Sequence, residues 1–132
     1  MRPLYLTPDT VKEKATGSAK ISINKVGLFT ISSVAAKKIG LAPGDKISIV
    51  QDEDDKVNFF LVNLGKKGKG FELKPFFIGE VKLLRFNSAG LRKKLVDGIY
   101  DGKASGTITL LIGASAKVGK EIFWAILGKS II

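Results

Sequence analysis

The 132-residue chain predicts a mostly β, α+β fold made of two strand–short helix–hairpin repeats. Three observations predict it. Segments that alternate apolar and polar residues are typical of half-buried strands, the one clearly capped helix between them is short, and the order of elements in the first half recurs in the second. The length suits about one domain, and 45% hydrophobic with 26% charged residues are ordinary globular values. We therefore expect one compact domain.

The chain is expected to open with an N-terminal arm, residues 1–17, because this segment carries two prolines and no sustained period. The first repeat, residues 18–66, then begins with two strands, "KISIN" and "VGLFTI". Gly27, which lies between their apolar residues, could supply a bulge or a bend.

A short helix is expected after the second strand. Ser32 and Ser33 precede "VAAKKIGL", and a serine hydroxyl can accept from the free N–H groups of a first helical turn. Gly40 is the residue type that ends a helix in the left-handed conformation. The turn "APGD" follows, and then "KISIV" and "KVNFFLV" read as a hairpin joined by the acidic loop "QDEDDK".

The second half echoes the first after a basic, glycine-rich linker, residues 67–75. "FTISSVAAKKIGL" aligns with "RFNSAGLRKKLVD", and "GDKISIVQDEDDKVNFFLVNLGK" finds a counterpart in "SGTITLLIGASAKVGKEIFWAILGK". We expect a divergent second repeat over residues 76–132. A unit of about 45 residues buries too little apolar surface alone, so the two repeats should pack on each other.

The run from Gly27 to Val50, above all "KKIGLAPGDKISI", resembles the swapped-hairpin DNA-binding domains of the AbrB, SpoVT and MazE type. The resemblance implies that two units interlock their hairpins in one small β-barrel and bind DNA through basic residues on the loop and helix side. Two units in one chain resemble the MraZ arrangement. Two positions depart from the family pattern: Ser32 replaces the proline that leads the helix, and Leu28 stands where a basic residue often follows the motif glycine.

The charge agrees with a polyanionic partner. With 22 Lys plus Arg against 12 Asp plus Glu, the formal net charge is +10, and nucleic acid is the most abundant polyanion. We expect a non-enzymatic DNA-binding protein, a transcriptional regulator, with arginine as the better reader of base edges. Pairing into a homodimer or higher homo-oligomer stays open. The candidate nucleic-acid-binding residues are Lys25, Lys37, Lys38, Lys82, Arg85, Arg92, Lys93 and Lys94.

Several function classes are disfavoured by residue types the chain lacks. It has no histidine and no cysteine, which excludes cofactor-free Ser/His/Asp and Cys/His catalysis and thiolate metal sites. The acids from Asp52 to Asp55 lack the mid-loop glycine and distal glutamate of a calcium loop. No apolar run approaches the roughly 20 residues that span a bilayer, and no export signal is recognised. We expect no enzyme activity, cofactor, metal or membrane partner, and a cytoplasmic location.

Two alternatives to duplex DNA binding remain. One is a protein-interaction module, such as an antitoxin or a scaffold. The other is sequence-tolerant binding of single-stranded nucleic acid, in which aromatic rings stack on bases above a basic groove. Adjacent aromatic residues in a strand face opposite sides, so at least half of the candidates should belong to the core. These candidates are Phe59, Phe60, Phe76, Phe77, Phe123 and Trp124.

Overall fold

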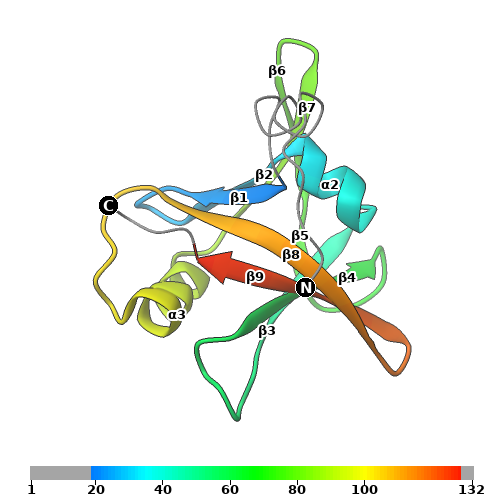
Figure 1. Ribbon diagram of the computed structural model, residues 1–132. Helices are drawn as coiled ribbons and strands as arrows, with labels where there is room; N and C mark the ends of the chain where they lie inside the picture. Colours follow the sequence, from blue (N-terminus) through cyan, green and yellow to red (C-terminus); the bar gives the residue numbers. More distant parts are fainter. Residues whose placement is uncertain (1–18, 129–132) are drawn as a thin grey trace, which may run out of the picture.

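The structure, a computed structural model, describes residues 19–128 and shows nine strands and two helices within them (Figure 1). The predicted arm, residues 1–17, lies outside the described residues. The elements of the first half are β1 (Lys20–Ile23), β2 (Leu28–Ile31), α2 (Ser33–Ile39), β3 (Lys46–Gln51) and β4 (Phe59–Gly65). Those of the second half are β5 (Phe71–Glu72), β6 (Lys74–Ile78), β7 (Val81–Asn87), α3 (Ala89–Tyr100), β8 (Ile108–Val118) and β9 (Glu121–Gly128).

All strands belong to one antiparallel sheet with the order β5-β3-β4-β9-β8-β1-β2-β7-β6. The two ends of this order, β5 and β6, are separated along the chain by Leu73 alone. The chain itself therefore joins the two ends, and the sheet is nearly closed into a barrel. The predicted fold class, a mostly β barrel built from two repeats, is confirmed.

The two repeats interlock. Each half runs hairpin, helix, hairpin, and the β1–β2 hairpin of the first half lies between β8 and β7 of the second. The halves also meet where β4 pairs with β9. Neither half forms a complete sheet of its own, so the barrel depends on hydrogen bonds between repeats.

Local sequence determines both ends of α2. The Ser32 hydroxyl accepts from the Ala35 N–H at 3.1 Å, as predicted for an N-cap. Gly40 ends the helix with a φ of 84°, in the left-handed region that favours glycine, and its N–H donates to the Ala36 carbonyl at 2.8 Å. In α3, Ser88 has the same role, and its hydroxyl accepts from the Leu91 N–H at 3.1 Å.

Two segments differ from the sequence-based expectation. The strand predicted from "KVNFFLV" begins only at Phe59, because Asn58 belongs to the preceding turn, where its N–H donates to the Asp55 carbonyl and its side-chain amide to the Asp55 carboxylate. The predicted linker, residues 67–75, contains β5 and the start of β6. β5 pairs with β3 and β6 pairs with β7, so this stretch occupies the place that β1 has in the first repeat.

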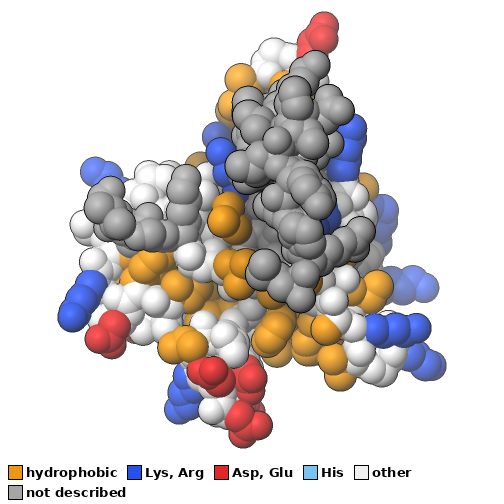
Figure 2. Space-filling model, in the orientation of Figure 1, with side chains coloured by type: hydrophobic (Ala, Val, Ile, Leu, Met, Phe, Trp, Pro, Cys, Tyr) orange, Lys and Arg blue, Asp and Glu red, His pale blue; other side chains and the backbone are white. Residues whose placement is uncertain are grey.

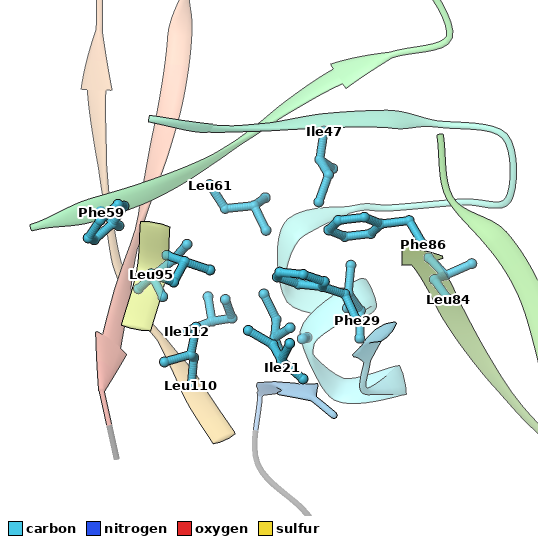
Figure 3. Packing of buried hydrophobic residues seen from close by; sticks show 14 of the residues in the cluster. Ile21, Phe29, Ile47, Phe59, Leu61, Leu84, Phe86, Leu95, Leu110 and Ile112 are labelled. Atoms are coloured by element: carbon cyan, nitrogen blue, oxygen red, sulfur yellow. The ribbon is translucent and has the colours of Figure 1, made fainter. Parts of the chain in front are cut away.

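The core lies inside the barrel and draws on both repeats (Figure 3). Phe29 of β2 stacks on Phe86 of β7 with 4.5 Å between ring centroids, and Phe71 stacks on the other side of Phe86 at 4.9 Å. Leu95 of α3 points into the same interior and is fully buried. No helix within residues 19–128 is long and apolar enough to cross a membrane.

Asp45 is the buried charged residue of the described chain, and it organises the turn before β3. Its carboxylate accepts from the Ala42 N–H at 2.9 Å and from the Lys66 ammonium at 3.0 Å. Burial raises the pKa of Asp45, but the Ala42 hydrogen bond and the Lys66 charge together outweigh burial, so the net pKa is lowered. The backbone of the same residue accepts from the Leu73 N–H at 2.8 Å, which ties the turn to the junction of β5 and β6.

Candidate nucleic-acid interface

The eight predicted cations fall into two corners of the barrel and three separate positions. We call the surroundings of Lys37 and Lys82, with Glu80, the α2 corner, and the surroundings of Lys25, Arg92 and Lys93, with Asp97, the α3 corner. In Figure 1, α2 lies beside the β6–β7 hairpin at the top, whereas α3 lies at the lower left. The structure therefore does not bring all eight residues onto one helix face.

The α2 corner joins a helix of the first repeat to a hairpin of the second. Lys37 of α2 and Lys82 of β7 line a cavity of about 440 Å³, with Ala36 and Leu84 at its apolar base. Both lysines are exposed. Glu80, in the turn between β6 and β7, lines the same cavity, so two cations share the site with one carboxylate.

The α3 corner repeats this arrangement with the halves exchanged. Lys93 of α3, in the second repeat, and Lys25, in the β1–β2 turn of the first, line a cavity of about 330 Å³ together with Arg92. Lys93 stands five residues after its N-cap Ser88, as Lys37 does after Ser32. Three cations here share the site with one carboxylate, that of Asp97.

The β1–β2 turn is held firmly against the start of α3. Asn24 orders the turn, since its side-chain oxygen accepts from the N–H groups of Val26 at 3.1 Å and Leu28 at 2.9 Å. The Gly27 carbonyl then accepts from the Ser88 N–H at 2.9 Å. Gly27 has a φ of 93°, and a Cβ there would lie 2.8 Å from the backbone of Ala89. The turn that carries Lys25 can thus approach the helix because this residue is glycine.

Arg92 lines the cavity of the α3 corner and also forms hydrogen bonds to the protein backbone. Its Nη1 donates to the Ile23 carbonyl at 3.3 Å and its Nη2 to the Gly106 carbonyl at 2.8 Å. It thereby links α3 to the end of β1 and to the segment before β8. Its positive charge remains at the α3 corner, but both terminal nitrogens of its guanidinium donate hydrogen bonds to backbone carbonyls of the protein.

Lys38 lies away from both corners, and Lys94 lines a separate cavity that shares Asp97 with the α3 corner. The Lys38 ammonium donates to the Ile112 carbonyl at 3.2 Å and lies 5.9 Å from the centroid of the Trp124 ring, a cation–π contact. Lys94 lines a shallow cavity with Lys56 and Asp97, beside the β3–β4 loop. That loop is acidic, and Figure 2 shows Asp and Glu side chains gathered on it at the foot of the view. Of the two aligned lysine pairs, Lys37–Lys38 and Lys93–Lys94, only the first lysine of each pair therefore lines a corner cavity.

Arg85 lies on β7 and stacks on an aromatic ring. Its Cζ is 3.4 Å from the centroid of Phe76, on the neighbouring strand β6. Its Nε is buried and has no hydrogen-bond partner among the described residues. The pair lines a cavity of about 570 Å³ that also contains Lys74 and Asn87. Sequence analysis missed this role of Phe76, because only the strand register brings it next to Arg85.

The aromatic candidates separate into core and surface residues. Phe59 is buried, whereas Phe60 and Phe123 are half-buried and lie 6.0 Å apart between ring centroids. Trp124 is half-buried beside Lys38. Phe76 and Phe77 are exposed at the β6–β7 hairpin, with 36% and 61% of their surface accessible. They do not form one continuous stacking surface with the other four residues.

The cations of both corners have no carboxylate partner at ion-pair distance in the described part of the chain. Within residues 19–128, the ion pair is that of Lys66 with Asp45. The corner lysines can therefore meet an external anion without first breaking a salt bridge to a described residue.

Comparison of the chain with protein-family models, with curated proteins and with solved structures finds no match. The resemblance to the swapped-hairpin DNA-binding domains thus stays a prediction.

Proposed function

We propose that the protein is a non-enzymatic DNA-binding protein that holds the phosphates of a duplex at the α2 and α3 corners. The observation that carries the proposal is the repetition of one arrangement: in each corner, a helix lysine of one repeat lies beside a lysine of the other repeat's first hairpin region. A lysine on a solvated helix face needs no such partner, whereas a phosphate site gains from two converging cations.

The spacing of the corners suits one duplex. They lie at opposite ends of the β2–β7 ribbon, and the five residue-to-residue steps along β7 from Lys82 to Asn87 span about 17 Å at 3.3 Å per step. A DNA duplex carries one phosphate charge per about 1.7 Å of its axis. A single duplex can therefore present different phosphates to the two corners of one protein molecule. Binding of this kind depends on charge, and it would be largely independent of sequence.

In a regulator of this kind, recognition of the base sequence falls mainly to Arg85. Arg92 has committed its fork to two backbone carbonyls, while Arg85 stacks on Phe76 and borders the largest of the cavities described here. A planar guanidinium is suited to bidentate contact with guanine.

The test is a titration of labelled duplex DNA, single-stranded DNA and RNA, followed by fluorescence anisotropy at several salt concentrations. Each phosphate contact adds about 0.9 to the slope of log affinity against log salt concentration. Changing Lys37, Lys82, Lys25 and Lys93 together to glutamine should reduce this slope by about 3.6 and weaken binding strongly at low salt.

The matched control removes lysines from the β8–β9 hairpin, where Lys117 and Lys120 are exposed and distant in the fold from both corners. A double glutamine variant there should change the slope by less than the corresponding pair of corner substitutions. If it weakens binding as much as a corner pair, only net charge matters and the proposed sites are wrong. Absence of binding at low salt would refute the function itself, and a preference for single strands would favour the stacking alternative.

A further inference from the structure

The largest of the cavities described here lies at a seam of the barrel. Residues 71–78 form one continuous segment, which pairs first with β3 through Phe71 and Glu72 and then with β7 from Lys74 onward. β3 and β7 do not pair with each other, so strand pairing does not close the barrel beside this segment. The cavity of about 570 Å³, which we call the seam cavity, has lining residues from β5, β6 and β7. Ligand sites often lie at the mouths of β-barrels, and this volume is within their usual range.

Aromatic rings line the seam cavity. Phe71 and Phe86 pack in the core, and their rings stack with 4.9 Å between centroids. Phe76 is 36% exposed and carries the Arg85 guanidinium on its ring. Aromatic rings and guanidinium planes are the surfaces on which unpaired bases stack. The cavity therefore suits a ligand that is planar and partly apolar.

Four polar side chains line the same cavity and face away from the core. Glu72 and Lys74 are exposed on either side of a buried leucine. Arg85 and Asn87 lie on either side of the buried Phe86. Because side chains alternate along a strand, each pair lies on the outer face of the sheet. Lys74 is the cross-strand partner of Arg85, so two cations stand side by side near the Glu72 carboxylate.

These four side chains form no hydrogen bond or ion pair with a residue between positions 19 and 128. By contrast, both terminal nitrogens of Arg92 donate to backbone carbonyls, and the other three asparagines of the described chain bond through their side chains. Lys46, which lies opposite Glu72 on β3, is not at ion-pair distance from it. The donors and the carboxylate of the seam cavity are therefore available to a ligand.

Arg85 has a further reason to bind an acceptor. Its Nε is buried and has no hydrogen-bond partner among the described residues, and leaving a buried donor unpaired costs free energy. Because Nε has almost no accessible surface, an acceptor reaches it only when the guanidinium turns from the Phe76 ring toward the cavity. A bidentate, charge-assisted contact is stronger than a cation–π contact, so a suitable ligand can drive this turn.

The donors and acceptors indicate the class of ligand. The arginine fork fits two adjacent acceptors, whereas the Glu72 carboxylate fits two adjacent donors. Guanine has both sets, because O6 and N7 are acceptors while N1 and the N2 amino group are donors. Adenine presents an amino group where the fork needs a second acceptor. Glu72 can accept from guanine only where the Watson–Crick edge is unpaired, since cytosine occupies this edge in a duplex.

We propose that the seam cavity binds an unpaired guanine nucleotide. Arg85 binds O6 and N7 of the base, Glu72 accepts from its Watson–Crick edge, and Lys74 contacts the phosphate as a point charge. Glu72 is not at ion-pair distance from either cation, so the nucleotide does not have to break a salt bridge. The nucleotide comes either from the free pool or from an unpaired position of a strand, and both sources present the same base and phosphate.

Isothermal titration calorimetry of the full chain with guanosine, inosine and adenosine monophosphate tests the base. The natural chain should bind GMP about tenfold more tightly than AMP or IMP, because AMP offers the fork one acceptor fewer and IMP lacks the N2 amino group. Glu72→Ala changes an exposed residue and should abolish most of the preference for GMP over IMP. Equal affinity for GMP and AMP, an unchanged preference in the variant, or no GMP binding up to about 1 mM would overturn the proposal.

Two charge variants separate a phosphate contact from net charge. Lys74→Gln and Lys82→Gln each remove one positive charge from the β6–β7 hairpin, but only Lys74 lines the seam cavity. Lys74→Gln should weaken GMP binding about three- to fivefold, and Lys82→Gln should change it less than about twofold. Equal losses in the two variants would show that only net charge matters, and the assigned site would be wrong.

Nuclear magnetic resonance follows the Arg85 side chain itself. The Nε–H of each arginine gives its own signal in proton–nitrogen correlation spectra, and Arg92 is an internal control because its guanidinium already donates to backbone carbonyls. Saturating GMP should shift the Arg85 signal and leave that of Arg92 nearly unchanged. If GMP binds and the Arg85 signal does not move, the nucleotide lies elsewhere and the proposal fails.

A thymine oligonucleotide with one central guanine distinguishes the two sources, and either result below agrees with the proposal. Higher affinity than for the all-thymine strand identifies an unpaired guanine of a strand, whereas binding of GMP alone identifies the free nucleotide. A nucleotide in the seam cavity occupies the arginine that the proposed function assigns to base recognition, so the two contacts exclude each other. The GMP titration contains no DNA, and the corner substitutions lie outside the seam cavity, so the two proposals fail separately.

Discussion

Replacing Arg92 with methionine should destabilise the barrel, because this side chain joins α3 to the end of β1 and to the segment before β8. Methionine keeps much of the apolar stem and removes the donors to the Ile23 and Gly106 carbonyls. Ile23 is fully buried, so water would not readily replace the bond to its carbonyl. Gly106 is exposed, and water can replace that bond at little cost.

The expected loss follows from these two environments. A carbonyl left without its charged donor in a buried strand costs about 1–3 kcal/mol in the free energy of unfolding, and the exposed bond adds little. At about 2.1 cal/mol/K per residue, a chain of this length should lose about 4–11 °C in melting temperature. Arg92→Lys should fall between the natural chain and Arg92→Met, since an ammonium can satisfy one carbonyl well but not both.

Thermal and urea unfolding followed by circular dichroism measure the effect. Lys93→Met is the matched control, because it removes the same charge from the next helix position, where the side chain is exposed and its stability effect should stay within about 0.5 kcal/mol. In the DNA titration, we expect the reverse order. Relative to its effect on the free energy of unfolding, Lys93→Met should lower the affinity for DNA more than Arg92→Met does. Equal stability of the two variants would show that the backbone contacts of Arg92 contribute nothing to the fold.

Two further predictions concern packing in α3 and the turn before β3. Gly98→Ala should destabilise by about 1–3 kcal/mol, because its Cβ would lie 2.6 Å from the buried Phe59 ring, whereas Gly90→Ala in the same helix meets nothing within 4 Å and should stabilise by about 0.5–1 kcal/mol. Urea unfolding of both should give opposite signs, and equal signs would contradict the contact. Asp45→Asn should cost about 1–2 kcal/mol at neutral pH by losing the charged bond to the exposed Lys66. Because the folded pKa of Asp45 lies below its unfolded value of about 3.9, this stabilisation is complete well above that pH and is lost as pH falls through the folded pKa. The stability difference between the natural chain and the variant should therefore shrink below about pH 4, and a constant difference would refute the assignment.

Features set by neighbouring residues could be predicted from the sequence. Both ends of α2 follow from Ser32 and Gly40, whose effects act within one helical turn. The start of β4 could not, since the side-chain bonds between Asp55 and Asn58 extend the loop into a segment with strand-like composition. A loop stabilised by its own polar side chains competes with the strand that follows it.

The candidate site was predicted only in part, for a geometric reason. Consecutive helix residues point about 100° apart, which directs the two lysines of each adjacent pair to different surroundings. Lys37 reaches the α2 corner, while Lys38 turns toward Ile112 and Trp124. The partner of Lys93 is Lys25, in a turn of the other repeat, and that proximity depends on the pairing of β2 with β7. No local pattern in the sequence encodes it.

The interlocked hairpins also constrain the order of events during synthesis. β1 finds its second partner only in β8, where Ile23 pairs with Ile108, so the first half of the sheet waits for most of the described chain to leave the ribosome. Contacts this distant in sequence close large loops and slow folding. Until then, the emerging β1–β2 hairpin exposes an unpaired edge, the kind of surface that chaperones protect and that neighbouring nascent chains can capture. The first half thus completes its strand pairing only after β8 and β9 of the second half have been synthesised.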